Sequence, residues 1–394
     1  MTAKSFHPPQ RTLMGPGPSD VHPRILEAMG RPTVGHLDPA FVAMMDELKD
    51  MLRYAFQTEN ALTMPVSAPG SAGMETAFVN LVEPGDKVVV CRNGVFGGRM
   101  QENVERAGGT AVTVEDAWGD PVDPDKVEDT LKAHPDAKIL AFVHAETSTG
   151  AQSDARTLAE IARRHDCITL VDTVTSLGGT PLRVDAWGLD AVYSGTQKCL
   201  SCVPGLSPVT FSERALEKVK SRQTRVQSWF MDLNLVLGYW GGGAKRTYHH
   251  TAPVNTLYAL HEALVMLREE GLENAWERHR RHHEALRAGI EAMGLSFVVG
   301  SEARLPQLRA SAAGIRSRNR RGARRDGRQD LAHRSDGPRG ESAQRPLLPR
   351  RAGRRAERHA GTDPGRRRGT GRDGGLRRLR KPEGLQCTKA LAPR

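Results

Sequence analysis

Short apolar runs alternate with helical patterns through the first half of the chain. Strand-like runs of β-branched and other apolar residues occupy residues 87–90, 111–114, 139–143, 168–171 and 191–193. Helical spacing of apolar residues recurs over residues 40–56, 123–133 and 154–165. Several of the strand-like runs are apolar throughout, which is typical of strands covered by helices on both faces of a sheet. The alternation predicts an α/β fold with a doubly wound, mainly parallel sheet.

The pattern changes before and after this region. Residues 1–40 are rich in Pro and Gly and predict an extended arm with turns. Helical spacing returns at Val254, and residues 296–299 predict the first strand of a smaller C-terminal domain. We therefore divide the chain into four parts: an N-terminal arm (1–20), a large domain (21–253), the start of a small domain (254–308) and an Arg-rich, disordered segment (309–394).

The Arg-rich segment carries most of the positive charge of the chain. Its first 72 residues, 309–380, contain 23 Arg and seven Asp or Glu but no Lys, Phe, Tyr, Trp, Met, Val or Cys. Their net charge is +16 and that of residues 381–394 is +2, whereas the whole chain carries +11, so residues 1–308 carry about −7. Because the globular part is mildly acidic, the net charge of the chain does not indicate a nucleic-acid-binding protein.

Neither export nor membrane insertion is indicated. The five cysteines form no disulfide framework, the first ten residues lack an apolar leader core, and no run approaches about 18 apolar residues. We expect a cytoplasmic protein with no membrane partner. Cys199 and Cys202 have CxxC spacing, but there is no second pair to complete a zinc site, so we expect both to be packed in the core.

Two ionisable residues follow neighbouring predicted strands. Asp172 comes directly after one strand, and Lys198, 26 residues later, follows the next. Both should therefore lie at the carboxyl edge of the sheet, where open α/β sheets bind ligands. Pyridoxal phosphate requires such a pair, because a lysine forms the Schiff base and a carboxylate keeps the pyridine nitrogen protonated. The freed lysine can then act as a general base. On spacing alone, a surface lysine and an ordinary loop contact of the Asp remain the alternative.

A series of motifs in a fixed order accompanies this pair. They are MGPGPS (14–19), GH (35–36), APGSAGME (68–75), EPGD (83–86), NGVFG (93–97), ETSTG (146–150), VD (171–172), GTQK (195–198) and YHHT (248–251). In their order and spacing, from residue 13 to about 308, the chain resembles the class V aminotransferases of fold type I, in particular the alanine–glyoxylate and serine–glyoxylate group. The resemblance implies a seven-stranded-type sheet in a large domain, a smaller α+β domain and pyridoxal 5′-phosphate as cofactor.

The resemblance also implies roles for individual residues. Lys198 and Asp172 are the catalytic pair. The other cofactor-binding residues are Gly70, Ser71 and Ala72 at the phosphate, Phe96 stacked on the ring, Thr147, Val174 beneath the ring, and Gln197 at the phosphate. The phosphate contact at residues 70–72 also follows from the helical run after them, because a helix N-terminus binds anions.

Residues from a second subunit complete the implied site. Tyr248 and Thr251 are expected to reach the phosphate of the neighbouring subunit, which makes a homodimer necessary. Gly17 and His36 are expected to line the substrate pocket. We expect no metal at His249 and His250, because adjacent residues of an extended chain point apart.

The implied reaction is a ping-pong transamination. An amino group moves from alanine or serine to glyoxylate or another small 2-oxo acid, and we expect no nucleic-acid partner. Two alternatives stay open. One is another class V reaction such as desulfuration, for which Cys199 and Cys202 adjoin Lys198 too closely to act as a mobile catalytic cysteine. The other is an inactive relic with an Arg-rich tail that binds nucleic acid.

The Arg-rich segment has two interpretations, a disordered anion-binding tail or GC-rich DNA translated in the wrong frame. The absence of Lys beside 23 Arg favours the second. Residues 315–337, back-translated with permitted codons and read one base later, give FEVEIGAGLGEMAGKTWRIGLMG, which resembles the missing C-terminal segment of the family. There the arginine of the W-R-I-G stretch binds the substrate carboxylate. In this chain its bases are read across Ala332 and His333. We therefore predict a cofactor site that is encoded and a substrate site that is impaired.

Overall fold

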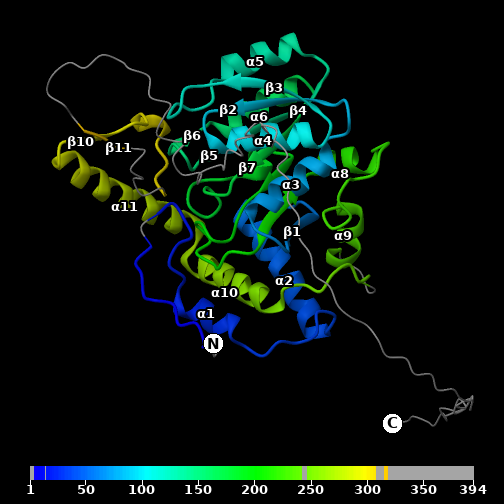
Figure 1. The fold of residues 1–394 in the computed structure, drawn as a ribbon, viewed down its shortest axis with the longest axis vertical. Helices are drawn as coiled ribbons and strands as arrows, with labels where there is room; N and C mark the ends of the chain where they lie inside the picture. The colour runs from blue at the N-terminus through cyan, green and yellow to red at the C-terminus, as the bar shows by residue number, and fades with distance from the viewer. Residues whose placement is uncertain (1–3, 14, 242–245, 308–314, 318–394) are drawn as a thin grey trace, which may run out of the picture. The chain divides into compact units, whose positions relative to one another are not determined.

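A seven-stranded sheet forms the centre of the protein. The computed structural model describes residues 4–13, 15–241, 246–307 and 315–317 (Figure 1). The strand order is β1-β9-β8-β7-β4-β2-β3. The bounds of the strands are β1 Leu62–Val66, β2 Lys87–Arg92, β3 Thr110–Glu115, β4 Ala137–Val143, β7 Ile168–Asp172, β8 Ala191–Tyr193 and β9 Ser207–Phe211. Only β9 runs antiparallel to its neighbours, so the predicted mainly parallel sheet is confirmed.

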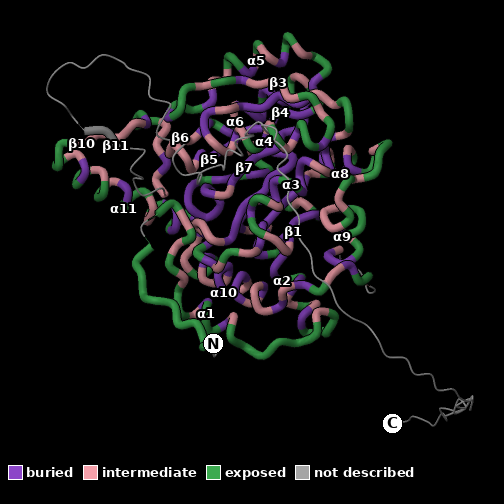
Figure 2. Tube along the Cα trace, in the orientation of Figure 1, coloured by how far each residue is buried: buried purple, intermediate pink, exposed green. Residues whose placement is uncertain are grey.

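Helices cover both faces of this sheet. One group comprises α3 (Gly70–Leu81), α4 (Val95–Arg106) and α8 (Glu213–Lys220), and the other α5 (Pro124–Ala133), α6 (Ala155–Arg164) and α7 (Val184–Trp187). Strands β2 and β3 contact α4 from the first group and α5 from the second, which places the groups on opposite faces. As a result β1, β7, β8 and β9 are buried along their whole length (Figure 2). Burial on both faces is the reason that such strands read as continuous apolar runs.

Residues 23–29 form a helix where we expected an extended arm. In α1 (Pro23–Met29), Pro23 takes the first helical position, and His22 caps the helix by accepting a hydrogen bond from Arg24 N at 3.2 Å. Ile25 and Ala28 lie one turn apart and are buried where α1 packs on α10 (Val254–Glu270). Seven residues are too few for a clear helical period, so the surrounding Pro and Gly dominated the sequence pattern.

Two strands of the central sheet, β1 and β9, were not predicted. Each contains a proline, and Pro65 lies directly opposite Pro208 in their antiparallel register. Proline in an apolar run argues against a central strand because it cannot donate to the ladder. Here the two missing N–H groups fall at a single position of the ladder, and β1 is an edge strand of the sheet. The pairing therefore tolerates both prolines.

The remaining elements surround this framework. They are α2 (Pro39–Phe56), α9 (Leu233–Trp240), α11 (Leu272–Ala292), the short pair β5 (Ala145–Glu146) and β6 (Ala151–Gln152), a 3₁₀ turn at Ser301–Ala303, and the pair β10 (Leu295–Phe297) and β11 (Ile315–Ser317).

No helix among the described residues has the length and hydropathy needed to cross a membrane. Of the segment 309–394 only β11 is described, so the predicted change of reading frame, with Ala332 and His333, lies outside the described residues.

Candidate functional site

The loops after β7 and β8 meet the start of α3. Asp172 ends β7 and is paired in register with Tyr193 of β8, five residues before Lys198. A Cβ added at Gly70 would lie 3.4 Å from Val174 Cγ2 and 3.6 Å from Gly195 Cα. The fold therefore brings the first turn of α3, the loop after Asp172 and the segment that leads to Lys198 to one edge of the sheet. Ligands bind at this carboxyl edge in open α/β folds.

Asp172 is a buried carboxylate held by two hydrogen bonds. Its Oδ1 accepts from Val174 N at 2.8 Å, and its Oδ2 accepts from Tyr193 Oη at 2.7 Å. Burial raises the pKa of the Asp172 carboxyl to about 7, and the charge of Glu146 acts in the same direction. Within the described parts of the chain, no Lys, Arg or His forms an ion pair with it. The site thus offers a carboxylate whose charge a protonated ring nitrogen would balance.

The Lys198 amine lies beneath the N-terminal arm. Its Nζ donates to the carbonyl oxygen of Pro16 at 2.9 Å. Burial lowers the pKa of Lys198, which increases the fraction of neutral amine and so its nucleophilicity. The next residue of the arm, Gly17, adopts a φ of +135°, and an added Cβ would lie 2.6 Å from Lys198 Cδ and 2.7 Å from its Nζ. A larger residue at position 17 would have to displace the end of the Lys198 side chain and adopt a φ that side chains rarely take.

We expect Gly17→Ala to slow cofactor capture about tenfold, because the new methyl group would displace Lys198 and strain the backbone by roughly 1–3 kcal/mol. The rate of the absorbance change on mixing cofactor-free protein with pyridoxal phosphate measures the effect. Gly15→Ala is the matched control, since a Cβ at Gly15 would meet no atom within 4 Å. Equal rates for the two variants would show that the arm does not constrain Lys198.

Unpaired polar groups at the start of α3 form an anion cradle. The N-cap residue Pro69 provides no side-chain cap, so the first amides of α3 point out of the helix without a cap. Gln197 directly precedes Lys198, and the Oε1 atom of Gln197 is buried without a hydrogen-bond partner. Of the three phosphate contacts predicted on α3, Gly70 and Ser71 keep their amides available, whereas Ala72 N donates to Pro69 O at 2.7 Å. The free amides of Gly70 and Ser71 fit a phosphate group at a helix N-terminus, whereas Gln197 can donate to a phosphate only through its Nε2 group.

Phe96 and Thr147 come from neighbouring elements at the same edge. Phe96 lies in the first turn of α4 and is partly buried, with the Arg99 guanidinium 5.0 Å from the centre of its ring. Thr147 follows β5, and its hydroxyl contacts the Thr175 hydroxyl. Thr175 Oγ1 donates in turn to Ala145 O at 3.1 Å, so Thr147 is the donor in their contact. Both predicted residues are therefore held in place by packing or hydrogen bonds.

Three predicted residues have no described contact with Lys198 in the single chain. His36 Nδ1 is 3.1 Å from Tyr239 Oη, and its ring lies 5.4 Å from that of Tyr248. The Tyr248 side chain is 64% exposed, and Thr251 is also exposed. Among the described contacts, none joins His36, Tyr248 or Thr251 to Lys198, Asp172 or the start of α3.

The two adjacent histidines face each other, contrary to our expectation. His249 Nδ1 and His250 Nδ1 are 2.8 Å apart, and His250 Nε2 lies 2.7 Å from Ser67 Oγ. The chain bends at His250, so the alternation of side chains along an extended segment does not apply. Burial lowers the pKa of His250 to about 4. In the ranges that the structure describes, no three His, Cys, Asp or Glu residues gather as metal ligands.

Two residues of the site were not singled out in the sequence. Tyr193 was assigned only to a strand, yet its hydroxyl holds Asp172. Glu146 was only one position of a motif, yet its side chain is fully buried and accepts hydrogen bonds from Phe96 N and Ser148. The register of β7 against β8 identifies Tyr193, and a sequence pattern does not specify that register.

The pH dependence of stability should report on Asp172. The ordinary pKa of an Asp is 3.8, and the folded value is about 7, so the folded protein binds this proton more tightly than the unfolded chain does. Asp172 therefore removes stability as the pH rises from about 4 to about 7, on the order of a few kcal/mol. We expect Asp172→Asn to flatten the fall in unfolding temperature of the cofactor-free protein between pH 4 and pH 8. Tyr193→Phe removes a donor to the carboxylate and so raises the folded-state pKa further, which should extend the fall to higher pH. An unchanged profile in both variants would contradict this assignment.

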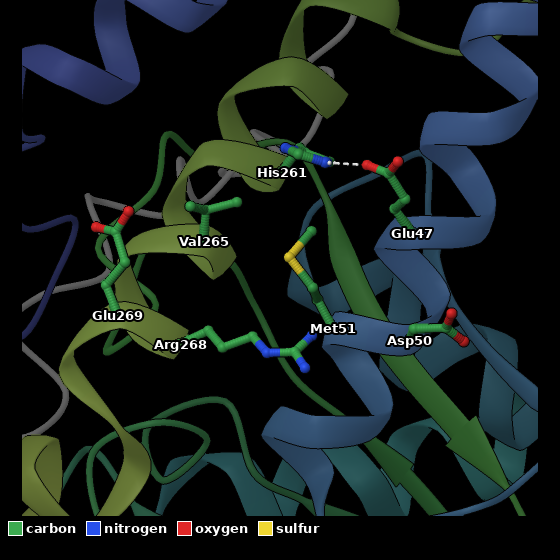
Figure 3. A pocket seen from close by; sticks show the side chains of 7 residues that line it. All are labelled: Glu47, Asp50, Met51, His261, Val265, Arg268 and Glu269. Carbon is green, nitrogen blue, oxygen red and sulfur yellow. Dashed lines mark hydrogen bonds and ion pairs between the residues drawn. The ribbon is translucent and has the colours of Figure 1, made fainter.

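A groove between α2 and α10 is separate from this site. Its lining comes from both helices, and His261 Nε2 lies 2.9 Å from Glu47 Oε2 across it (Figure 3). The remaining lining residues are Asp50, Met51, Val265, Arg268 and Glu269. None of the predicted cofactor or substrate residues lines the groove, so we do not include it in the candidate site.

Known proteins are similar to this chain in sequence and in fold. The family profile "Aminotransferase class-V" matches residues 24–315. A relative from Oryctolagus cuniculus, named alanine–glyoxylate aminotransferase, is 42% identical over 302 residues, which are 76% of this chain and 77% of the relative. A relative from Bacillus subtilis, named (S)-ureidoglycine–glyoxylate transaminase, is 38% identical over 317 residues, covering 76% and 75% of the two chains.

A solved structure of similar fold carries the same name as several of the relatives found by sequence. The crystal structure of an alanine–glyoxylate aminotransferase from Nostoc sp. superposes with a TM-score of 0.76 at 48% identity, covering 78% of this chain and 80% of that one. The buried Asp172, the half-buried Lys198 and the uncapped start of α3 are the groups that pyridoxal phosphate requires at this edge. The chain therefore belongs to the class V aminotransferase family and is a transaminase whose cofactor is pyridoxal 5′-phosphate.

Proposed function

We propose that this chain transfers an amino group from alanine to glyoxylate. The observation that carries the proposal is the closeness of Gly17 to Lys198, where even a methyl group would meet the lysine side chain at 2.6 Å. The arm backbone covers the reactive amine, with Pro16 O 2.9 Å from Lys198 Nζ, and so close a cover favours small donors and acceptors. The named relatives differ in their donor, alanine or ureidoglycine, but share glyoxylate as acceptor. Serine remains the second donor candidate, because it is nearly as small as alanine.

In the proposed mechanism, each residue acts on a defined atom. Bound pyridoxal phosphate supplies an electron-withdrawing ring that stabilises negative charge at the substrate Cα. Lys198 Nζ would anchor the cofactor, and its neutral amine would take up the proton that leaves the substrate Cα. Asp172 holds the proton on the ring nitrogen, and Tyr193 keeps the Asp172 carboxylate in place. Gly70, Ser71 and Gln197 bind the phosphate, while Phe96, Thr147 and Val174 position the ring.

Desulfuration is not favoured by the two cysteines beside Lys198. Burial raises the pKa of the Cys199 thiol to about 12, and that thiol donates to Thr175 O at 3.2 Å. Burial also raises the pKa of the Cys202 thiol to about 12. Since the thiolate is the nucleophile, neither cysteine provides the reactive group that a desulfurase needs.

Coupled assays of product formation test the substrate proposal. Pyruvate should form from alanine and glyoxylate faster than hydroxypyruvate forms from serine and glyoxylate, at equal concentrations. Replacing glyoxylate with the larger acceptor 2-oxoglutarate should lower the rate strongly. A preference for 2-oxoglutarate would contradict a narrow site at Gly17.

We further propose that the site is completed in a homodimer. The exposed Tyr248 and Thr251 support this proposal, because both side chains are accessible to a second copy. Mixed dimers provide a test: Lys198→Ala chains combined with Tyr248→Ala chains should regain one intact site per mixed dimer if Tyr248 acts across the interface. If Tyr248 acts within its own chain, mixing should restore no cofactor retention. Sedimentation at micromolar concentration measures the oligomeric state directly.

A further inference from the structure

The Glu146 carboxylate joins two elements that carry cofactor residues. Its side chain is fully buried at the end of β5. Its Oε2 accepts from Phe96 N at 3.3 Å, in the first turn of α4. Its Oε1 accepts from the Ser148 amide at 3.0 Å and from the Ser148 hydroxyl at 2.5 Å. One carboxylate thus connects the start of α4 to the turn that contains Thr147.

This contact takes the place of the ordinary cap of α4. The N-cap residue is Gly94, which has no side chain, so the first amides of the helix need acceptors from elsewhere. Glu146 accepts from Phe96 N, and Ser148 Oγ accepts from Val95 N at 3.0 Å. A negative charge at this end is also favoured by the helix dipole. The cap of α4 therefore comes from the turn after β5.

Close packing at Gly94 makes the connection specific. A Cβ added at Gly94 would lie 2.4 Å from Glu146 Cδ and 2.6 Å from Ser148 Oγ. Any larger residue would push the carboxylate away from α4. The glycine, the glutamate and the serine therefore form one interlocking unit.

The same turn is attached to the loop after Asp172. The Thr147 hydroxyl contacts Thr175, and the Thr175 hydroxyl donates to Ala145 O at 3.1 Å. Burial raises the pKa of the Glu146 carboxyl, and its charge contributes to the raised pKa of Asp172. Glu146 is therefore linked by contacts to Phe96 and Thr147, and by charge to Asp172.

We propose that Glu146 is a positioning residue of the cofactor site, which holds α4 and the β5 turn together so that Phe96 and Thr147 reach the ring at the same time. Glu146 itself does not touch the reacting atoms in this proposal. The proposal rests on the cofactor-binding roles of Phe96 and Thr147 in the proposed function.

Cofactor affinity tests the role of Glu146 without requiring turnover. Cofactor-free protein is titrated with pyridoxal phosphate, and quenching of tryptophan fluorescence gives the dissociation constant. Because a hydrogen bond to a charged group contributes about 1.5–3 kcal/mol, we expect Glu146→Ala to bind about 100-fold more weakly and Glu146→Gln about tenfold more weakly. Affinities of both variants within twofold of the wild type would overturn the proposal.

Asn80→Ala is the matched control for a lost buried cap. Asn80 is also fully buried, and its Oδ1 accepts from Leu233 N at 3.0 Å at the start of α9. We expect Asn80→Ala to lower the unfolding temperature while cofactor affinity stays near that of the wild type. Equal weakening by Asn80→Ala and Glu146→Ala would mean that general destabilisation explains the effect, and would overturn the proposal. If Glu146→Ala does not fold, Glu146→Gln alone decides.

Two further measurements separate the possible failures. Phe96→Ala should weaken cofactor binding. Unchanged binding in Phe96→Ala would mean that the role assigned to Phe96 in the proposed function is wrong. Weaker binding in Phe96→Ala together with unchanged binding in the Glu146 variants would overturn only the present proposal. Glu146→Gln should also move the Asp172 titration of the cofactor-free protein to lower pH, because it removes a negative charge. Tyr193 and Lys198 also influence Asp172 and remain in the variant. An unmoved titration would contradict the electrostatic link.

Discussion

Lys198→Ala abolishes covalent retention of pyridoxal phosphate and lowers transamination by roughly 10²–10⁴-fold or more, the contribution of a well-placed general base. The physical reason is the position of this amine: Lys198 Nζ lies beneath the arm at Pro16 O, and its pKa is lowered by burial. An ammonium group in water cannot replace an amine whose pKa burial lowers and which lies near the charge of Asp172. The variant should still bind the cofactor phosphate, because the cradle at α3 is intact.

Mass spectrometry after borohydride reduction measures this result. The wild-type chain should gain the mass of one reduced cofactor, and Lys198→Ala should gain none. Lys218→Ala is a suitable control, because Lys218 of α8 is also a mostly buried lysine. Its Nζ lies 2.9 Å from Asp86 Oδ2. It should label as the wild type does. Labelling of the Lys198→Ala chain would show that another lysine anchors the cofactor.

A variant in which the segment after about residue 308 is translated one base later should have a kcat/KM for amino acid substrates roughly 10²–10³-fold higher, since one bidentate arginine–carboxylate contact contributes a few kcal/mol. The match to the family profile ends at residue 315, a few residues after the Arg-rich segment begins, and this supports the predicted gain in kcat/KM. The cofactor residues all precede that point, so cofactor affinity should change much less than substrate turnover.

Steady-state kinetics and cofactor titration of the two chains separate these effects. In the variant translated one base later, replacing the arginine of the Trp-Arg-Ile-Gly stretch with alanine should return kcat/KM to the level of the chain as written. Resequencing the gene around codon 308, together with the intact mass of the natural protein, decides between a sequencing error and a genuine tail. Equal kcat/KM for both chains would mean that the Arg-rich segment does not impair substrate binding.

Much of the fold was predictable because long periodic segments determine their own structure. The helix expected over residues 40–56 is α2 (Pro39–Phe56), and the five strands expected between residues 87 and 193 are all in the central sheet. Short or proline-containing elements were not predictable. Helix α1 depends on burial of Ile25 and Ala28 against α10, and β1 depends on pairing with β9 across opposed prolines. These contacts join residues far apart in the chain, which a local pattern does not register.

The sequence by itself determined the identity of the chemical groups: a lysine and an aspartate after adjacent strands, a glycine-rich start of a helix, and a fixed order of motifs. Only the tertiary structure decided how these groups are tuned. Strand register placed Tyr193 on Asp172, burial raised the pKa of that carboxyl to about 7, and the arm brought Gly17 against Lys198. Solvation and hydrogen-bond partners are properties of three-dimensional packing, so a sequence specifies which side chain is present but not the medium in which it ionises.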